Sequence, residues 1–149
     1  METIKKSIET KNLSLEEKKA IVRRYCEGGV SEWKEVCAPD MKVNAPPIPT
    51  INGLEELVKY TNAGWGQHMK EPHNKAFKVD EMIAEGEAIA VRWSAHGTPK
   101  NDWTVPGIAT FKADKPISFI GLSIIRLRND KIIEEYTIHG PFQQESEKK

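Results

Sequence analysis

The sequence is poor in cysteine, and this limits the metal and redox sites that it can form. Only Cys26 and Cys37 are present among the 149 residues. They form no CxxC motif, and no histidine is separated from either cysteine by the number of residues typical of a zinc site. A disulfide framework is therefore excluded, and we expect no metal. Both thiols are interpreted as reduced, as in a cytoplasmic protein.

The sequence also has no long hydrophobic run and no excess of charge of one sign. No apolar stretch approaches the roughly 18 residues of a membrane helix, and the start, METIKKSIETKN, lacks the apolar core of a signal peptide. Lys plus Arg and Asp plus Glu number 22 each, so no overall field attracts nucleic acid or an anionic membrane. We expect a cytoplasmic protein with neither as a partner.

Several motifs of nucleotide and hydrolase chemistry are absent. The sequence contains no GxxxxGK[ST], GxGxxG, HExxH or GxSxG. These absences argue against a P-loop NTPase, a dinucleotide-binding Rossmann enzyme, a zinc protease and an α/β-hydrolase. With 38% hydrophobic and 30% charged residues, the chain is nevertheless suited to one compact core. We expect a single domain over residues 1–149, with a core over about 14–142 and frayed ends.

The first half of the sequence has the pattern of helices. Ser14 with Glu17 forms a capping box, and Gly28-Gly29 supplies a stop after one helix. A short helix is predicted over Ser31–Cys37, ended by Pro39. A third helix is predicted from Asn52 to His68, and Gly64 and Gly66 are expected to loosen it.

The second half has the pattern of strands. Strands are predicted over 75–84, 88–97, 116–128 and 131–139, the last two as a hairpin joined at Asn129-Asp130. Residues 98–102 are predicted to form a loop. Helices followed by strands favour an α+β fold, with the helices on one side of an antiparallel sheet.

Four histidines are the candidates for acid-base chemistry, since imidazole titrates near neutrality. His96 and His139 rank first, because each ends a strand, where a rigid sheet holds a side chain beside a cavity. His68 lies on the apolar stripe of the third helix and is a candidate pocket wall. His73 follows Pro72 in a loop, and we expect it to be solvated.

Tryptophans and carboxylates complete the candidates. Trp33 and Trp65 lie on predicted helices and are natural walls for a flat organic ligand. Trp93 alternates with apolar residues of its strand and is expected in the core. Glu134 and Glu135 are adjacent on the last strand, so only one of them points inward.

Four segments carry a resemblance to a known family. They are residues 52–57 (NGLEEL), 90–98 (AVRWSAHGT), 120–127 (IGLSIIRL) and 130–136 (DKIIEEY). In this order they resemble the SnoaL-like polyketide cyclases of the nuclear-transport-factor-two-like superfamily. The resemblance implies a cone-shaped, curved sheet packed against about three helices and enclosing a pocket. It also implies a homodimer, and general acid-base catalysis without a metal or organic cofactor.

The sequence departs from the family at its acid-base residue. The family places an Asp four residues after an aromatic residue, which here is Tyr136, and that position is Gly140. His139 is the neighbouring proton carrier, but a regular strand places it on the face opposite Tyr136 and Gly140. A bulge near Gly140 would turn it into the pocket.

Three hypotheses remain. In the first, the protein is an enzyme that acts on a small hydrophobic carbonyl compound, with His139 or His96 as acid-base and Arg92 steadying an oxyanion. In the second, it is a non-catalytic binding module whose pocket is lined by residues such as Trp33, Trp65 and Tyr136. In the third, the polar outer face around Arg92 and His96 forms a dimer interface.

Overall fold

The computed structural model describes residues 13–144, and the predicted fraying of the chain ends falls on residues outside this range. The helices are α2 (Leu15–Gly28), α3 (Val30–Val36), α4 (Leu54–Thr61), the π-helix η1 (Asn62–Gly66) and α5 (His73–Ala76). The strands are β1 (Cys37–Asn44), β2 (Ile51–Asn52), β3 (Phe77–Glu85), β4 (Ala88–Gly97), β5 (Trp103–Val105), β6 (Ala109–Phe111), β7 (Ile117–Arg128), β8 (Lys131–His139) and β9 (Gln143–Gln144). The α+β prediction is confirmed.

Helix α2 begins and ends at the predicted signals. The Ser14 hydroxyl accepts a hydrogen bond from the backbone N–H of Glu17 at 3.1 Å, and the Glu17 carboxylate accepts one from the N–H of Ser14 at 3.2 Å. Gly29 follows the helix with φ of 80°, a conformation that glycine adopts without strain. The buried residues Val22 and Tyr25 turn one face of α2 to the core.

The third predicted helix is interrupted where glycine was expected to loosen it. Helix α4 ends at Thr61, and the chain continues as a π-helix that contains both Gly64 and Gly66. The predicted cap, Asn52, instead pairs with Lys42 in the short strand β2. The wider turn carries Trp65 to a buried position, at 8% exposure.

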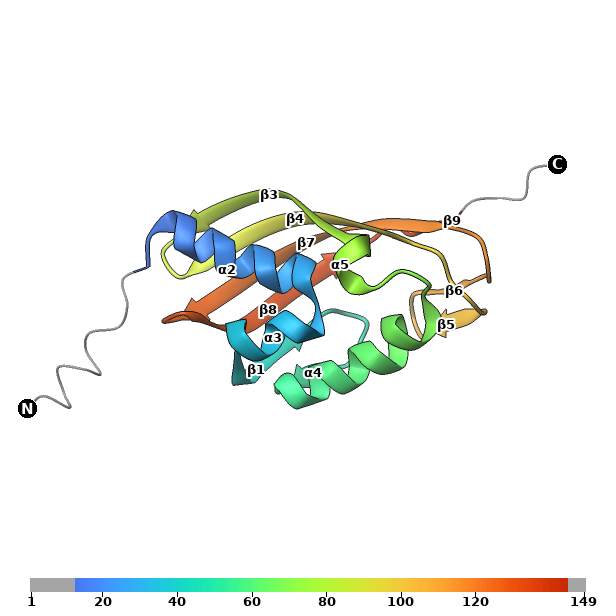
Figure 1. Ribbon diagram of the computed structural model, residues 1–149, viewed down its shortest axis with the longest axis horizontal. Coiled ribbons are helices and arrows are strands. Elements are labelled where there is room, and N and C mark those ends of the chain that lie inside the picture. The colour runs from blue at the N-terminus through green and yellow to red at the C-terminus, as the bar shows by residue number, and fades with distance from the viewer. Residues whose placement is uncertain (1–12, 145–149) are drawn as a thin grey trace, which may run out of the picture.

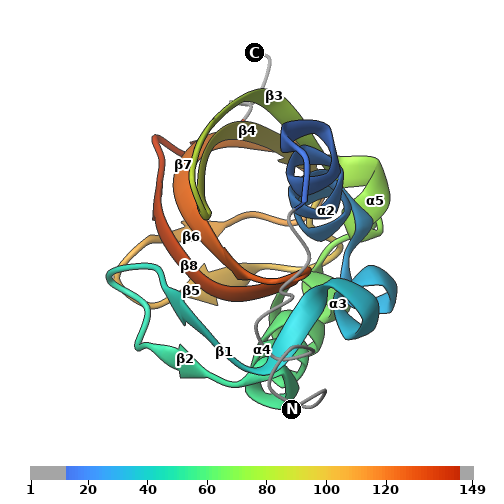
Figure 2. The same cartoon turned by 90° about the vertical axis from the view of Figure 1, so that its left-hand side faces the viewer.

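The main sheet has the strand order β2-β1-β8-β7-β4-β3, and β9 pairs with β7. Its neighbours are antiparallel except β1 and β8, which run parallel, so the sheet is mixed. Pro39, predicted to follow a helix end, lies inside β1, where the pairing with β8 is interrupted between Cys37 and Lys42. Figure 2 shows the sheet curving around the core, with α2, α3 and α4 across its open side.

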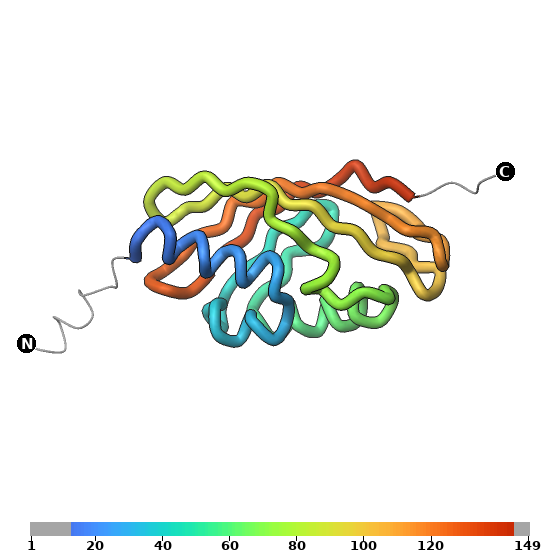
Figure 3. Tube along the Cα trace, turned by 45° about the horizontal axis from the view of Figure 1, so that its top comes forward, coloured from blue at the N-terminus to red at the C-terminus, as the bar shows by residue number. Residues whose placement is uncertain are grey.

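A second, two-stranded sheet was not predicted. β5 and β6 form a hairpin that follows the predicted loop over 98–102. Figures 1 and 3 show this hairpin at the same end of the molecule as η1. The indole of Trp103 in β5 packs against Gly64 of η1, so closely that a Cβ atom at position 64 would lie 3.3 Å from it. The hairpin therefore closes one end of the curved sheet.

The core fills the concave side of the sheet. The buried cluster combines Val22 and Trp33 from the helices with Ile89, Trp93 and Ile125 from the strands. Within residues 13–144, no helix is long and apolar enough to span a bilayer.

Candidate active site on the concave face

A bulge in β8 decides which side chains enter the concave side of the sheet. Opposite β7, Ile132 pairs with Leu127 and Glu134 with Arg126, so Ile133 is the extra residue. An extra residue reverses the alternation of faces beyond it. Thr137 is therefore buried at 3% exposure, while its neighbours on β8 turn outward.

His139 follows the same alternation and points inward. The register pairs it with Gly121, which lies against the buried Trp93 indole. Tyr136 lies on the outer face and is 46% exposed. This is the reverse of the regular-strand expectation, in which Tyr136 faced the pocket. The register is regular from Tyr136 to His139, so the bulge expected near Gly140 is not present, and these two residues lie on opposite faces as in a regular strand. His139 faces inward because the extra residue at Ile133 precedes both of them.

An aromatic cavity of about 190 Å³ lies on the concave face, and we call it the inner cavity. It is bounded by the π-helix, the β5–β6 hairpin, the start of β7 and the segment after β8. Half of its lining residues are aromatic, namely Tyr60, Trp65, Phe77, Trp93, Trp103, Phe111, Phe119 and Phe142. The wall also contains two imidazoles, of His73 and His139, and the aliphatic side chains of Ile48, Val105, Ile108 and Ile117. The site thus joins an apolar container to groups that can exchange protons.

His139 stands at the edges of two phenyl rings. Its ring centroid lies 6.5 Å from that of Phe119 and 5.3 Å from that of Phe142, with planes at 88° and 71°. These edge contacts hold the imidazole from the side. Within residues 13–144, no side chain or backbone group forms a hydrogen bond with its ring nitrogens. They are therefore available to a molecule in the cavity.

His73 is held differently, and the expectation that it is solvated is wrong. Its Nε2 lies 2.9 Å from the carbonyl oxygen of Cys26. Its ring stacks on Phe77 with centroids 3.9 Å apart, and Nδ1 is closed to solvent without a hydrogen-bond partner. Burial lowers the pKa of His73 to about 4, although the hydrogen bond to Cys26 acts to raise it. The imidazole is therefore neutral at neutral pH.

A second cavity of about 150 Å³ lies behind the first, and we call it the rear cavity. The side chains of His73, Phe77 and Trp93 border both cavities. The rear cavity also contains Glu135, the inward member of the Glu134–Glu135 pair. Its aromatic wall includes Tyr25 and Trp33.

The carboxylate of Glu135 is satisfied by hydroxyl groups. It accepts hydrogen bonds from Tyr25, Thr137 and Ser123, the last at 3.1 Å. The indole N–H of Trp93 donates to Ser123 at 2.9 Å and extends this network. Burial raises the pKa of Tyr25 well above its ordinary value, and the charge of Glu135 raises it further. Tyr25 therefore stays protonated as a donor.

The predicted wall residues of the helices occupy three different places. Trp65 lines the inner cavity, and its indole N–H donates to the carbonyl of Glu71 at 2.9 Å. Trp33 lines the rear cavity. His68 borders neither cavity: it stacks on Trp103 at 5.3 Å, and its Nδ1 lies 2.6 Å from the amide oxygen of Asn101.

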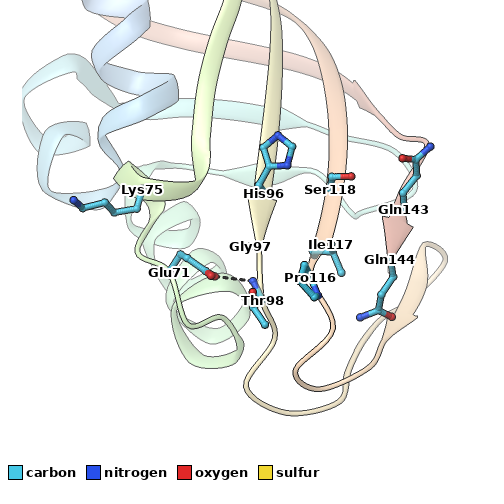
Figure 4. A pocket seen from close by; sticks show the side chains of 10 residues that line it. All are labelled: Glu71, Lys75, His96, Gly97, Thr98, Pro116, Ile117, Ser118, Gln143 and Gln144. Carbon is cyan, nitrogen blue, oxygen red and sulfur yellow. Dashed lines mark hydrogen bonds between the residues drawn. The ribbon is translucent and has the colours of Figure 1, made fainter. Parts of the chain in front are cut away.

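Arg92 and His96 lie on the outer face of the sheet, so the structure does not bring them together with His139. Arg92 faces Asp80 at 3.9 Å and Glu81 at 3.7 Å. His96 lines an open groove of about 540 Å³ at one end of the sheet. Figure 4 shows it beside Ser118 of β7, with which it pairs across the strands. In this position Arg92 cannot steady an oxyanion in the inner cavity.

Comparison with known proteins decides the family. Residues 19–135 match the SnoaL-like domain. The chain belongs to this family. No curated protein matches the SnoaL-like chain in sequence.

Solved structures share the SnoaL-like fold at low sequence identity. A protein from Jannaschia sp. CCS1, assigned as a SnoaL-like polyketide cyclase, has a TM-score of 0.67 at 13% identity, over 87% of this chain and 90% of its own. AclR from Streptomyces galilaeus, assigned as a hydroxylase, has a TM-score of 0.62 at 16% identity, over 85% and 81%. An NTF2-like protein of Burkholderia pseudomallei K96243 has a TM-score of 0.59 at 18% identity, over 84% and 90%. At these identities the likeness establishes the fold alone.

The family's Asp position has a backbone that disfavours a side chain. Gly140 has φ of 122°, outside the regions that L-residues ordinarily adopt, and its N–H donates to the carbonyl of Ile120 at 2.8 Å. An Asp there would be strained in this backbone. In this SnoaL-like chain, the proton carrier nearest to that position is His139.

Sequence reasoning missed several residues of the site. The sequence pattern predicts a loop position for His73 and gives Phe119 and Phe142 no role. The alternation of the strand over 116–128 contained a signal for Phe119, because it shares a face with Gly121 and Ser123. Among residues 13–144, no group of three or more His, Cys, Asp or Glu side chains is arranged to hold a metal ion.

Proposed function

We propose that the inner cavity binds a small, flat, mostly apolar carbonyl compound and that His139 moves a proton on it. The aromatic wall favours a planar apolar ligand. The volume favours a small one: about 190 Å³ compares with the roughly 150 Å³ of an apolar cavity that holds benzene. One ring with a short side chain matches this space, and a molecule of several fused rings exceeds it.

The observation that carries the proposal is the position of His139. Its ring lies in the wall of a cavity lined mainly by aromatic and aliphatic side chains, with no hydrogen bond to any residue within 13–144. A neutral imidazole there can remove a proton from the carbon next to a ligand carbonyl. The electrons of the broken C–H bond form a C=C bond, and the carbonyl π electrons pass to oxygen, giving an enolate.

Tyr60 supports the enolate in this proposal. It lines the same cavity, and burial raises the pKa of its phenol, so that it remains a hydrogen-bond donor. Return of the proton to another carbon completes an isomerisation. Attack of the enolate carbon on a second carbonyl, with protonation of that oxygen, completes an aldol cyclisation. Neither step requires a metal or an organic cofactor.

The experiment uses phenylacetone, which has one ring and acidic protons beside its carbonyl. The protein is incubated with it in D₂O, and the loss of the α-proton signal is followed by NMR. We expect the His139→Gln variant to lose at least about 100-fold in exchange rate, as is typical when a general base is removed. The matched control is His96→Gln, which removes a histidine from the outer face of the same sheet and should leave exchange unchanged.

Other outcomes separate the hypotheses. Unchanged exchange in His139→Gln would remove this residue from the mechanism. Binding of phenylacetone without exchange in the unmodified protein would instead favour the non-catalytic binding module. If phenylacetone neither bound to the protein nor exchanged its α-protons, the proposed function would be contradicted.

The outer face favours a second copy of this chain as the partner. Large apolar side chains stand exposed on three of its strands, with Ile83 65%, Leu122 62% and Ile138 65% exposed. A patch of this kind is typical of an interface. Residues of both charge signs lie around this patch; on one side of it, Arg92 lies beside Glu81. A two-fold axis through the patch can therefore place opposite charges together.

Oligomeric mass tests the homodimer. Light scattering after size exclusion at tens of micromolar should give twice the 16.8 kDa of the chain. Leu122→Glu places a charge in the patch and should return the monomer, while the fold, followed by circular dichroism, stays intact. A monomer in the unmodified protein would contradict the homodimer and leave the proposal for the inner cavity standing.

A further inference from the structure

Glu135 is the charged residue of the rear cavity, and no cation is paired with it. The other lining residues are neutral, His73 among them because burial lowers its pKa to about 4. The groups that donate to the carboxylate are the hydroxyls of Tyr25, Ser123 and Thr137. Among residues 13–144, no lysine or arginine lies within ion-pair distance of it. The hydroxyls satisfy its hydrogen bonds but do not neutralise its charge, which is costly to hold away from water.

The Glu135 side chain keeps accessible surface on the inside of the sheet. Its backbone pairs with Ile125 of β7 on one side and with Val43 of β1 on the other. Both of these partners are buried, yet Glu135 is only half-buried and lines the rear cavity. A carboxylate offers roughly four lone-pair positions. The three hydroxyl donors therefore leave room for a further partner in the cavity.

Aromatic side chains from four different elements line the same cavity. They are Tyr25 of α2, Trp33 of α3, Phe77 of β3 and Trp93 of β4. The rings of Tyr25 and Trp33 lie 5.7 Å apart with their planes tilted by 37°, and those of Phe77 and Trp93 lie 5.7 Å apart with a tilt of 49°. The rings therefore form walls in several directions rather than one flat slot. Aromatic rings accommodate apolar groups and also attract a cation to their faces.

The negative charge of Glu135 acts on the groups around this space. Burial first, and the charge of Glu135 second, raise the pKa of Tyr25, Cys26 and Cys37. These groups therefore stay neutral at neutral pH. A positive charge brought into the cavity would be attracted by the carboxylate and would meet no opposing cation among the lining residues.

We infer that the rear cavity binds a small organic cation, with its ammonium charge at Glu135 and its apolar substituents against the aromatic rings. A methylated ammonium compound has both features. The cavity of about 150 Å³ is similar to the roughly 150 Å³ that hold benzene, and choline is close to benzene in size. A metal ion does not match, because one carboxylate among aromatic rings supplies too few oxygen ligands. The inference goes beyond the proposed function and does not rest on it, since the cavity and the charged residue are different.

Choline and 3,3-dimethyl-1-butanol are the probes. They have the same shape, but choline has a positive nitrogen where the alcohol has a neutral carbon, so charge separates them. Binding to the full chain is followed by NMR at pH 7.5 through the indole N–H resonances of Trp33 and Trp93. These N–H groups are held at 2.9 Å by the carbonyl of Tyr25 and the hydroxyl of Ser123, so each reports on the wall of the rear cavity.

Glu135→Gln removes the charge from the cavity. Its matched control is Glu134→Gln, which makes the same charge change on the outer face of the same strand. We expect choline to shift both indole resonances and to bind at least about tenfold more tightly than the alcohol. Glu135→Gln should lose at least about tenfold in choline affinity, while its affinity for the alcohol changes less than about threefold. Glu134→Gln should keep the choline affinity within the same factor.

The unmodified protein supplies a second measurement, because Glu135→Gln can fail to fold. Nuclear Overhauser contacts are expected between the methyl protons of bound choline and the ring protons of Tyr25 and Trp33. Bound choline without these contacts would overturn the inference. Circular dichroism checks that each variant is folded before its affinity is compared.

The remaining outcomes are separate from those of the proposed function. Equal affinity for choline and the alcohol, equal loss of choline affinity in the two glutamate variants, or no choline binding would each overturn the cation site. None of these results alters the expected exchange of phenylacetone protons at His139. Conversely, a phenylacetone experiment without binding or exchange would leave the cation site standing.

Discussion

The two faces of the curved sheet use similar residues for different purposes. Each face carries a histidine near a strand end, but His139 lies in an aromatic wall and His96 in an open polar groove. Each face carries one of two adjacent glutamates. Glu135 accepts hydrogen bonds from hydroxyls inside, whereas Glu134 meets Arg126 at 3.7 Å outside. The comparison shows that the face, rather than the residue type, determines what each side chain can do.

Side-chain size should matter far more on the inner face than on the outer face. Ile125 is fully buried and Ile124 is 47% exposed, although the two are neighbours on β7. We expect Ile125→Ala to lower the free energy of unfolding by about 2–5 kcal/mol through lost burial and a cavity, and Ile124→Ala to lower it by less than about 1 kcal/mol. Urea unfolding at low protein concentration measures both. Equal losses would abolish the distinction between the faces.

The buried imidazole of His73 should make stability depend on pH. Its folded pKa of about 4 lies below the ordinary 6.5 or so of histidine. The unfolded chain therefore binds the proton more readily between these values, and stability falls as pH falls from about 6.5 towards 4. From pH 7.5 to 4.5, this group should remove roughly 2.5 kcal/mol of stability.

Urea unfolding of the full chain and of His73→Phe at both pH values tests this loss. The unmodified protein and the variant share all other titrating groups. The difference between their losses of unfolding free energy therefore isolates the contribution of His73. The variant should lose less stability on acidification than the unmodified protein does. Identical pH dependence in both would show that His73 titrates as an ordinary solvated histidine.

Substitutions of the two adjacent glutamates should change stability least, but they form the most closely matched pair of variants. Glu135→Gln weakens the acceptor of three hydroxyls and should cost about 1–3 kcal/mol of unfolding free energy. Glu134→Gln removes an exposed ion pair and should change it by no more than about 1 kcal/mol. Chemical unfolding under identical conditions provides both numbers. A larger effect at Glu134 would mean that the inward and outward assignments on β8 are reversed.

Much of the fold could be predicted because its signals are local. The Ser14–Glu17 capping box, the glycines around Trp65 and the Asn129-Asp130 turn each act within a few residues. The β5–β6 hairpin escaped prediction because its strands are only three residues each. Short strands carry too few residues for an alternating pattern to be recognised.

The candidate site was harder to predict because it depends on contacts between distant segments. The inward direction of His139 follows from an extra residue at Ile133, and nothing in the sequence DKIIEEY marks a bulge. The burial of His73 follows from Cys26 and Phe77 closing around it. A loop position next to a proline gives no signal of such packing.

A crystal structure of the protein grown with phenylacetone tests the central claim most directly. The account predicts density for the ligand ring on the concave face, among Phe119, Phe142 and Trp103, with its carbonyl side chain beside His139. Density in the outer groove beside His96, with the inner cavity filled by protein side chains or water, would contradict it.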